Sequence, residues 1–479
     1  MVRTDQFYID GQWVAAETSE TFPVVNPATE KTVAQLSMGT AEHVDRAVAA
    51  ARKAFPEFSR TTREERLALL ERIIAVYESR AEELAHLVMI EMGSPLWFGR
   101  EVQVQTALNH FKQAHKVLQD YDFGHMMSGT RIVREPVGVC GFITPWNWPI
   151  NQVAAKFASA FAAGCTVVVK PSEIAPLSPL LLAEIIHEAG VPAGVFNLIN
   201  GDGPTVGDAI SRHPDIDMVS FTGSTRAGVL VAKAAADTVK RVHQELGGKS
   251  ANILLPGTDL QKTVPASVLR SFTNSGQSCQ APTRLLVHRS EAGKVYEIAH
   301  ATAQSVTVGD PEASDSRLGP LASELQFERV QAMIQTGLDE GARLLAGGPG
   351  RPEHLATGWY ARPSIFVDVQ PQMTIAQQEI FGPVLSILVY DTVDEAVKIA
   401  NDSVYGLAGY VSAPSLDEAK AVGMRLRAGR IYLNGAPHSG AQDVEAPFGG
   451  YKQSGNGREA GLYGLEDFLE IKAMIGYAA

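Results

Sequence analysis

Cysteine is scarce in this sequence. Only Cys140, Cys165 and Cys279 occur among its 479 residues. A number that is both small and odd cannot supply a disulfide framework, so we expect a reducing compartment. Positive charge is also in deficit, because the formal net charge is −12. A general affinity for nucleic acid or for an anionic membrane surface needs a concentrated positive field, so neither is an expected partner.

Long apolar runs are missing as well. Residues 1–6 contain no hydrophobic segment of signal-peptide length. The most apolar stretch, residues 153–169, includes Lys156 and Gly164 and is too short to span a membrane. It predicts a buried helix that leads into a buried strand. We therefore expect a cytoplasmic protein, and the chain length indicates two large domains with a smaller appendage.

Short apolar strands alternate with helical patterns through the first half of the chain. Asp10-Gly11 predicts a hairpin turn, and Thr62 with Glu65 forms a capping box before a helical region that ends near Gly93. The predicted strands cover residues 137–143, 166–169, 195–199, 218–221 and 251–255. Between two of them lies a helix with Ser178 as N-cap. This alternation predicts an α/β fold with a doubly wound parallel sheet, which binds ligands beyond the carboxyl ends of its strands.

Two glycine-containing segments are candidates for a nucleotide site. Residues 201–207 have the spacing G-x-G-x-x-x-G, which is a weak signal alone. Phe221-Thr222-Gly223-Ser224 follows a predicted strand and opens a helix, where free amides and a hydroxyl can receive a phosphate. An ordinary capped helix is the alternative.

Seven motifs in order along the chain resemble those of the aldehyde dehydrogenase superfamily. They are Thr144-Pro145-Trp146-Asn147-Trp148-Pro149, Lys170-Pro171-Ser172-Glu173, Phe221-Thr222-Gly223-Ser224-Thr225, Glu245-Leu246-Gly247-Gly248-Lys249, Gly276-Gln277-Ser278-Cys279, Glu379-Ile380-Phe381-Gly382-Pro383 and Pro447-Phe448-Gly449-Gly450. The resemblance implies a doubly wound NAD(P)-binding domain (residues 1–117 and 138–246), an α/β catalytic domain (247–447) and a small β oligomerisation arm (118–137 and 460–479).

The resemblance also implies a mechanism in which an aldehyde is oxidised to a carboxylic acid. Cys279 would be the nucleophile that forms a thiohemiacetal and then a thioester. The Asn147 side chain and the Cys279 amide would stabilise the oxyanion. Glu245 would activate the water that hydrolyses the thioester, which disfavours a relative that transfers the acyl group to coenzyme A. Lys156 and Glu459 match a proton route in some relatives, with a structural ion pair as the alternative.

The cofactor assignment follows from the same resemblance. Glu173 can accept hydrogen bonds from both ribose hydroxyls and repel a 2′-phosphate, which favours NAD. Arg226 is a cation two positions after Ser224 that could approach the phosphates, so NADP is the alternative cofactor. No metal is expected. The full set of expected cofactor contacts is Ile143, Thr144, Trp146, Lys170, Ser172, Glu173, Gly203, Phe221, Gly223, Ser224, Leu246, Glu379 and Phe381.

Substrate choice is less well specified by the sequence. Trp148, Gln280 and Phe448 are expected to line the substrate pocket, and Ala155 stands where many relatives have a tryptophan, which predicts a wider tunnel. The segment 435–446 carries His438, Asp443 and Glu445. These charges favour a cationic aldehyde, or they belong to a solvated loop.

Two predicted strands indicate self-association. Residues 130–135 alternate like a strand after a flexible segment at 123–129, and residues 469–477 form a second candidate. In similar proteins such segments form an arm, so a homodimer or homotetramer is expected. Two rival functions stay open: a dehydrogenase dedicated to a semialdehyde or betaine-type aldehyde, and a catalytically silent relative retained for binding.

Overall fold

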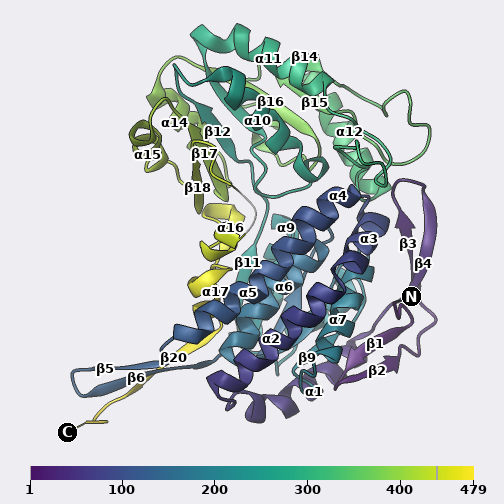
Figure 1. Ribbon diagram of the computed structural model, residues 1–479, viewed down its shortest axis with the longest axis vertical. Coiled ribbons are helices and arrows are strands. Elements are labelled where there is room, and N and C mark those ends of the chain that lie inside the picture. The colour runs from purple at the N-terminus through teal and green to yellow at the C-terminus, as the bar shows by residue number, and fades with distance from the viewer. Residues whose placement is uncertain (1, 438–440, 479) are drawn as a thin grey trace.

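The computed structural model describes residues 2–437 and 441–478. Two large sheets, each covered by helices on both faces, lie at opposite ends of the molecule, and a thin three-stranded sheet projects from one of them (Figure 1). None of the described helices has the length and apolar character needed to cross a lipid bilayer.

The first sheet has eight strands with a parallel centre. Its order is β19 (Gly455–Asn456), β11 (Arg241–Glu245), β10 (Met218–Thr222), β7 (Val139–Ile143), β8 (Thr166–Lys170), β9 (Phe196–Leu198), β1 (Gln6–Ile9) and β2 (Gln12–Ala15). The strands from β11 to β9 are parallel, whereas β19 and the β1–β2 hairpin add antiparallel edges. The hairpin prediction is confirmed, because Asp10 and Gly11 both have positive φ.

Alternation within the strands divides the core of this first half between the two faces of the sheet. In β8, Val167 and Val169 pack into one core, while Val168 packs into the other. The first core is covered by α2 (Arg63–Ser79), α3 (Ala81–Met92), α5 (Val104–Asp120), α6 (Pro149–Ala163) and α7 (Leu177–Glu188). The second is covered by α1 (Ala41–Phe58), α8 (Asp208–Arg212) and α9 (Thr225–Ala235). The doubly wound sheet is thereby confirmed.

Three local predictions concern helix ends, and one of them is wrong. The capping box of Thr62 and Glu65 is formed, and Gly93 ends α3 with φ 71°. Ser178, however, lies inside the first turn of α7 rather than at its N-cap. The buried carboxylate of Glu91 accepts hydrogen bonds from the Leu177 and Ser178 amides, so it satisfies the helix N-terminus from a distant part of the chain.

The second sheet has seven strands. Its order is β14 (Arg343–Ala346), β15 (Ser364–Val367), β16 (Val384–Tyr390), β13 (Arg284–His288), β12 (Ala251–Leu254), β17 (Ala408–Ser412) and β18 (Arg430–Leu433). Only the β14–β15 pair is antiparallel. The helices of this half are α10 (Leu260–Phe272), α11 (Ala292–Gln304), α12 (Glu324–Asp339), α13 (Thr374–Gln377), α14 (Val393–Asn401), α15 (Leu416–Gly423) and α16 (Ala441–Glu445).

The projecting sheet consists of β5 (Gly124–Met127), β6 (Thr130–Pro136) and β20 (Leu469–Met474), and it reaches away from both large sheets (Figure 1). The two predicted strands are confirmed, but the prediction that residues 123–129 are flexible is wrong, because most of them form β5 and its turn. Ser128 and Gly129 have φ of 48° and 77°, so they form a two-residue turn that pairs β5 with β6. A separate hairpin is formed by β3 (Thr21–Asn26) and β4 (Lys31–Ser37).

The remaining short helices connect these layers. A three-residue helix, α4 (Leu96–Phe98), continues through a π-helical turn into α5, and α17 (Gly461–Asp467) leads into β20. The carboxyl ends of β7, β10 and β11 lie beside one another in the first sheet. Their last residues are Ile143, Thr222 and Glu245, so the motifs that follow them open at the same sheet edge.

Candidate active site

Two cavities meet at Cys279. The larger has a volume of about 490 Å³, and Trp146, Asn147, Glu245 and Glu379 are among its lining residues. The smaller is lined by Trp148, Gln280 and Phe448, among others, and has a volume of about 70 Å³. Cys279 lines both. A thiol in this position can contact one ligand in each cavity.

The loop that carries Cys279 has an unusual backbone. After α10 the chain takes positive φ at Asn274 (56°), Ser275 (54°) and Gly276 (73°). A Cβ on Gly276 would lie 2.0 Å from the Gly382 carbonyl oxygen, so only glycine fits there. Side-chain hydrogen bonds also fix the loop, because Ser275 Oγ donates to the Gly319 carbonyl at 2.8 Å. The loop therefore presents the thiol from a defined backbone.

Asn147 packs directly against this loop. Its Nδ2 donates to the Gln277 carbonyl at 3.1 Å, and the residue is 3% exposed. Asn274 Nδ2 donates to the Asn147 carbonyl at 2.9 Å, while Gln103 Nε2 donates to Asn274 Oδ1 at 3.2 Å. The side-chain amide of Asn147 is thus fixed beside the Cys279 loop, where it can donate to a charge that develops next to the sulfur.

The thiol of Cys279 is held in its protonated form by its surroundings. Burial raises its pKa well above the ordinary range, and the charges of Glu379 and Glu245 raise it further. A thiolate requires a compensating positive charge or a base at this position. The larger cavity is the place where such a group can approach, because both carboxylates and the thiol line it.

Glu245 ends β11 and is 2% exposed. Burial raises its pKa to about 7, although His243 and Lys156 act in the opposite direction. His243 Nε2 lies 3.2 Å from Glu245 Oε1, whereas Oε2 has no partner among the described residues. The group can therefore exchange a proton near neutral pH, as a general base must.

Lys156 and Glu459 form a buried ion pair close to Glu245. Lys156 Nζ contacts Glu459 Oε1 and also donates to Ser220 Oγ at 2.9 Å. Both charges influence the pKa of Glu245, which Glu459 raises and Lys156 lowers. The structure thus shows the ion pair of the second interpretation near Glu245, and the proton route stays a prediction.

Six of the thirteen expected cofactor contacts line the larger cavity. Glu379 Oε1 accepts from the Gly248 amide at 2.9 Å, and a Cβ on Gly247 would lie 2.4 Å from Glu379 Oε2. The Trp146 and Phe381 rings meet edge to face at 5.5 Å. The expected residues that line the cavity are Trp146, Gly223, Ser224, Leu246, Glu379 and Phe381.

The other expected cofactor contacts lie outside the lining of this cavity. Lys170 Nζ is 3.2 Å from Glu173 Oε2 and donates to the Gly201 carbonyl at 2.6 Å. Gly203 begins a π-helical turn (Gly203–Gly207) whose N-cap is Asp202, so the weak glycine pattern forms a helix start. The remaining residues, Ile143, Thr144, Ser172 and Phe221, are buried beside the strand ends.

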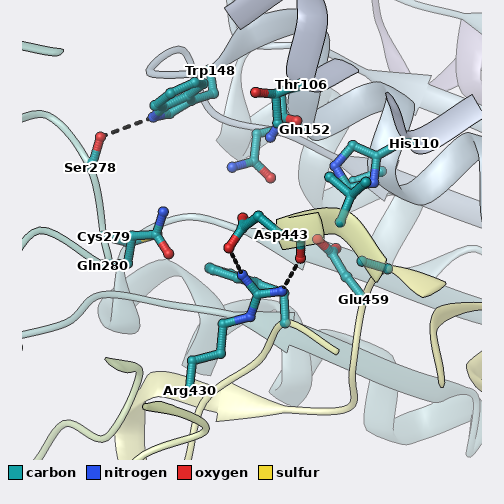
Figure 2. Close-up of a pocket in the computed structure, with 15 residues that line it drawn as sticks. Thr106, His110, Trp148, Gln152, Ser278, Cys279, Gln280, Arg430, Asp443 and Glu459 are labelled. Atoms are coloured by element: carbon teal, nitrogen blue, oxygen red, sulfur yellow. Dashed lines mark hydrogen bonds and ion pairs between the residues drawn. The ribbon is translucent and has the colours of Figure 1, made fainter. Parts of the chain in front are cut away.

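The smaller cavity contains all three expected substrate contacts and several polar groups (Figure 2). Trp148 Nε1 donates to Ser278 Oγ at 3.0 Å. Arg430 Nη1 donates to Asp443 Oδ1 at 2.7 Å, so the charge of Asp443 is balanced inside the chain. Glu445 is an exposed residue whose carboxylate lies 2.9 Å from Lys116 Nζ, and His438 lies outside the described residues.

Comparison with known proteins identifies the family to which this chain belongs. The model of the aldehyde dehydrogenase family matches residues 13–474. This chain belongs to the aldehyde dehydrogenase family. A Pseudomonas sp protein named 3-succinoylsemialdehyde-pyridine dehydrogenase is 56% identical over 473 residues, which are 98% of this chain and 98% of that protein.

Solved structures agree with this membership. Aldehyde dehydrogenase C of Pseudomonas syringae, a mutant in complex with NAD+ and octanal, superposes with a TM-score of 0.98 at 52% identity, covering 100% of this chain and 98% of its own. Betaine aldehyde dehydrogenase of Staphylococcus aureus, in complex with NAD+, gives 0.95 at 35% identity, with 99% and 95% covered. The family and fold expected from the motifs are confirmed.

Several polar residues near the active site of this aldehyde dehydrogenase were not predicted from its motifs. His110 and Gln152 line the smaller cavity, and burial lowers the pKa of His110 to about 4, so it is neutral at ordinary pH. His243 and Asp467 contact each other behind Glu245. The spacing of His243 and Glu245 was a usable signal, because residues two apart on a strand share a face.

Proposed function

We propose that this enzyme oxidises an aldehyde to a carboxylic acid with NAD+, through a thioester on Cys279. The observation that carries the proposal is the position of Cys279 at the meeting point of two cavities, with Asn147 and Glu245 lining the larger one. The smaller cavity receives the aldehyde and the larger receives the nicotinamide.

The larger cavity fits NAD+ on structural grounds. Ser224 caps α9 by accepting from the Ala227 amide, and Thr222 Oγ1 is buried without a partner among the described residues. A helix start of this kind can bind a phosphate. Glu379, the Trp146–Phe381 pair and Leu246 would hold the nicotinamide riboside, and Lys170 and Glu173 the adenosine ribose. NAD+ supplies a hydride acceptor and a positive ring when it is bound.

The first half of the reaction depends on Cys279 and Asn147. The sulfur adds to the carbonyl carbon, the carbonyl π electrons move to oxygen, and the thiol proton leaves to solvent. The Asn147 Nδ2 and the Cys279 amide donate to the resulting oxyanion. When that oxyanion collapses, the carbon loses its hydrogen with two electrons to the cofactor, and a thioester remains on Cys279.

The second half depends on Glu245. Its carboxylate accepts a proton from water while the water oxygen attacks the thioester carbon. The C–S bond then breaks, the sulfur leaves and takes up a proton, and a free carboxylic acid is released. Lys156 and Glu459 stabilise the charge of this region, and we assign them to a route by which the proton of Glu245 leaves.

The substrate proposed is an uncharged aldehyde. Asp443 is balanced by Arg430, Glu459 by Lys156, and His110 is neutral, so the charged side chains that line the smaller cavity are internally compensated among the described residues. Trp148, Ala155 and Phe448 give it apolar walls. A dedicated semialdehyde or betaine-type activity is the second candidate, because proteins with such names are similar to this chain.

The same proposal covers assembly, location and domain division. The projecting sheet leaves Ile471 64% exposed and Met126 47% exposed, which a second copy of the chain can cover in a homodimer or homotetramer. Residues 1–117 and 138–246 form the NAD-binding domain, residues 247–447 the catalytic domain, and residues 118–137 and 460–479 the arm. Free buried thiols at Cys140 and Cys165 support a cytoplasmic location.

The test is NADH formation by the purified protein with aliphatic, aromatic, acidic and quaternary-ammonium aldehydes, with NAD+ and NADP+ compared. Turnover that disappears in Cys279→Ala supports the mechanism, and the substrate ranking tests the uncharged class. Equal turnover in Cys279→Ala overturns the assignment of the nucleophile. NAD+ binding without turnover on any aldehyde favours the catalytically silent alternative.

A further inference from the structure

His243 lies between two carboxylates. His243 and Glu245 occupy alternate positions of β11, so both side chains are on one face of the strand. Nε2 is 3.2 Å from Glu245 Oε1, and Nδ1 contacts Asp467 Oδ2 at the end of α17. The Glu245 and His243 side chains are each 2% exposed, whereas that of Asp467 is 22% exposed. One line of contacts therefore joins the cavity carboxylate to the protein surface.

Backbone packing fixes the ring in this orientation. Gly457 has φ 81°, and a Cβ at this position would lie 2.7 Å from His243 Nδ1 and 2.9 Å from its Cγ. A Cβ on Gly449 would lie 2.8 Å from Glu245 Oε1. These glycines allow the backbone to pack closely against both side chains.

The charges around the ring favour its protonated form. Burial lowers the pKa of His243, but hydrogen bonds to Asp467 and Glu245 and the charge of Glu459 outweigh this and raise it to about 9. Lys156 faces the same cluster from α6, and Arg241 donates to the Asp467 carbonyl from the start of β11. An imidazolium donates from both nitrogens, as the two contacts require.

This arrangement gives the two oxygens of Glu245 different surroundings. Oε1 accepts from His243, and Oε2 has no partner among the described residues. A carboxylate held by one oxygen keeps the other available for water. The hydrogen bond and the charge of His243 also oppose the effect of burial and so lower the pKa of Glu245.

We propose that His243 is the positioning residue of Glu245: it holds Oε1 through a donated hydrogen bond, and Asp467 fixes the imidazolium. The inference rests on the proposed hydrolytic role of Glu245. It assigns to His243 and Asp467 a part in thioester hydrolysis that is separate from that of the Lys156–Glu459 pair, and it leaves the preceding oxidation step to other residues.

The experiment compares His243→Ala, His243→Gln and Asp467→Asn with the unaltered enzyme, using stopped-flow NADH traces across pH. In His243→Ala the NADH burst should persist while steady turnover falls by about tenfold. The acid limb of turnover should move to higher pH, because Glu245 loses a positive neighbour. His243→Gln keeps a neutral hydrogen-bond donor, so its turnover should be higher than that of His243→Ala. Its pH profile should still have the acid limb at higher pH than that of the unaltered enzyme. Asp467→Asn should shift the limb in the same direction.

The matched control is His115→Gln. His115 Nε2 lies 3.1 Å from Glu71 Oε1 in a His–Glu pair whose residues line neither cavity, so both burst and limb should be unchanged. An unmoved acid limb in all three variants, or an equal loss of burst and turnover, would overturn the inference. Absence of any Cys279-dependent NADH formation by the unaltered enzyme would instead overturn the proposed function itself.

Discussion

Replacing Glu245 by glutamine separates the two halves of the reaction. The side chain is 2% exposed, and its Oε2 has no partner among the described residues, so an amide of equal size fits with little rearrangement. The variant lacks the proton acceptor for water, and a general base contributes at least about a hundredfold. Thioester hydrolysis should slow by that factor, whereas formation of the thioester does not use Glu245.

The assay is stopped-flow NADH formation at high enzyme concentration. The expected trace for Glu245→Gln is a burst close to one NADH per active site, followed by turnover reduced about a hundredfold. Because burial raises the pKa of Glu245 to about 7, turnover of the unaltered enzyme should fall about tenfold for each pH unit below that value. The glutamine variant should lack this acid limb. Loss of the burst in proportion to turnover would refute the role, and would mean that Glu245 acts on the thiol.

Three further changes follow from particular contacts. Glu173→Gln removes the charge that repels a 2′-phosphate, so the ratio of kcat/KM for NADP+ over NAD+ should rise about fivefold or more, and an unchanged ratio would place cofactor selection elsewhere. Gly276→Ala puts a Cβ 2.0 Å from the Gly382 carbonyl at φ 73°, so urea unfolding should show a loss of at least about 2 kcal/mol together with lost turnover, whereas Gly293→Ala on α11, with open space around it, should show neither. Ile471→Lys places a charge on the exposed face of β20, so light scattering should show a smaller assembly than that of the unaltered chain, and the same mass would exclude this face from the interface.

Local patterns were sufficient for some of the elements that surround the site. The strands that end at Ile143 and Thr222 are continuous apolar runs followed by helix starts, so both could be predicted from residues close in sequence. The strand that ends at Glu245 has the polar sequence Arg-Val-His-Gln-Glu, and it was not among the predicted strands. The hairpin at Asp10-Gly11 and the helix stop at Gly93 depend on backbone angles that glycine favours. Each of these local structures depends on residues that are close together in the sequence.

The missed features depend on residues that are distant in sequence. Glu91 caps α7 from 86 and 87 residues away, which displaced Ser178 from its predicted role. His243 meets Asp467 across 224 residues, and Glu379 meets the Gly248 amide across 131. Arg430 and Asp443 are only 13 residues apart, but they lie on different elements, β18 and α16. Their contact compensates in the fold a charge that favoured a cationic substrate in the sequence.

The proposed mechanism requires Cys279 to carry the acyl group. The most direct measurement is acid quenching of the enzyme during turnover with NAD+ and an aldehyde, followed by mass analysis of its cysteine peptides. We expect an acyl adduct on the Cys279 peptide alone, dependent on NAD+, with the buried Cys140 and Cys165 unmodified. Turnover without any adduct on Cys279, or an adduct on either of the other two cysteines, would contradict it.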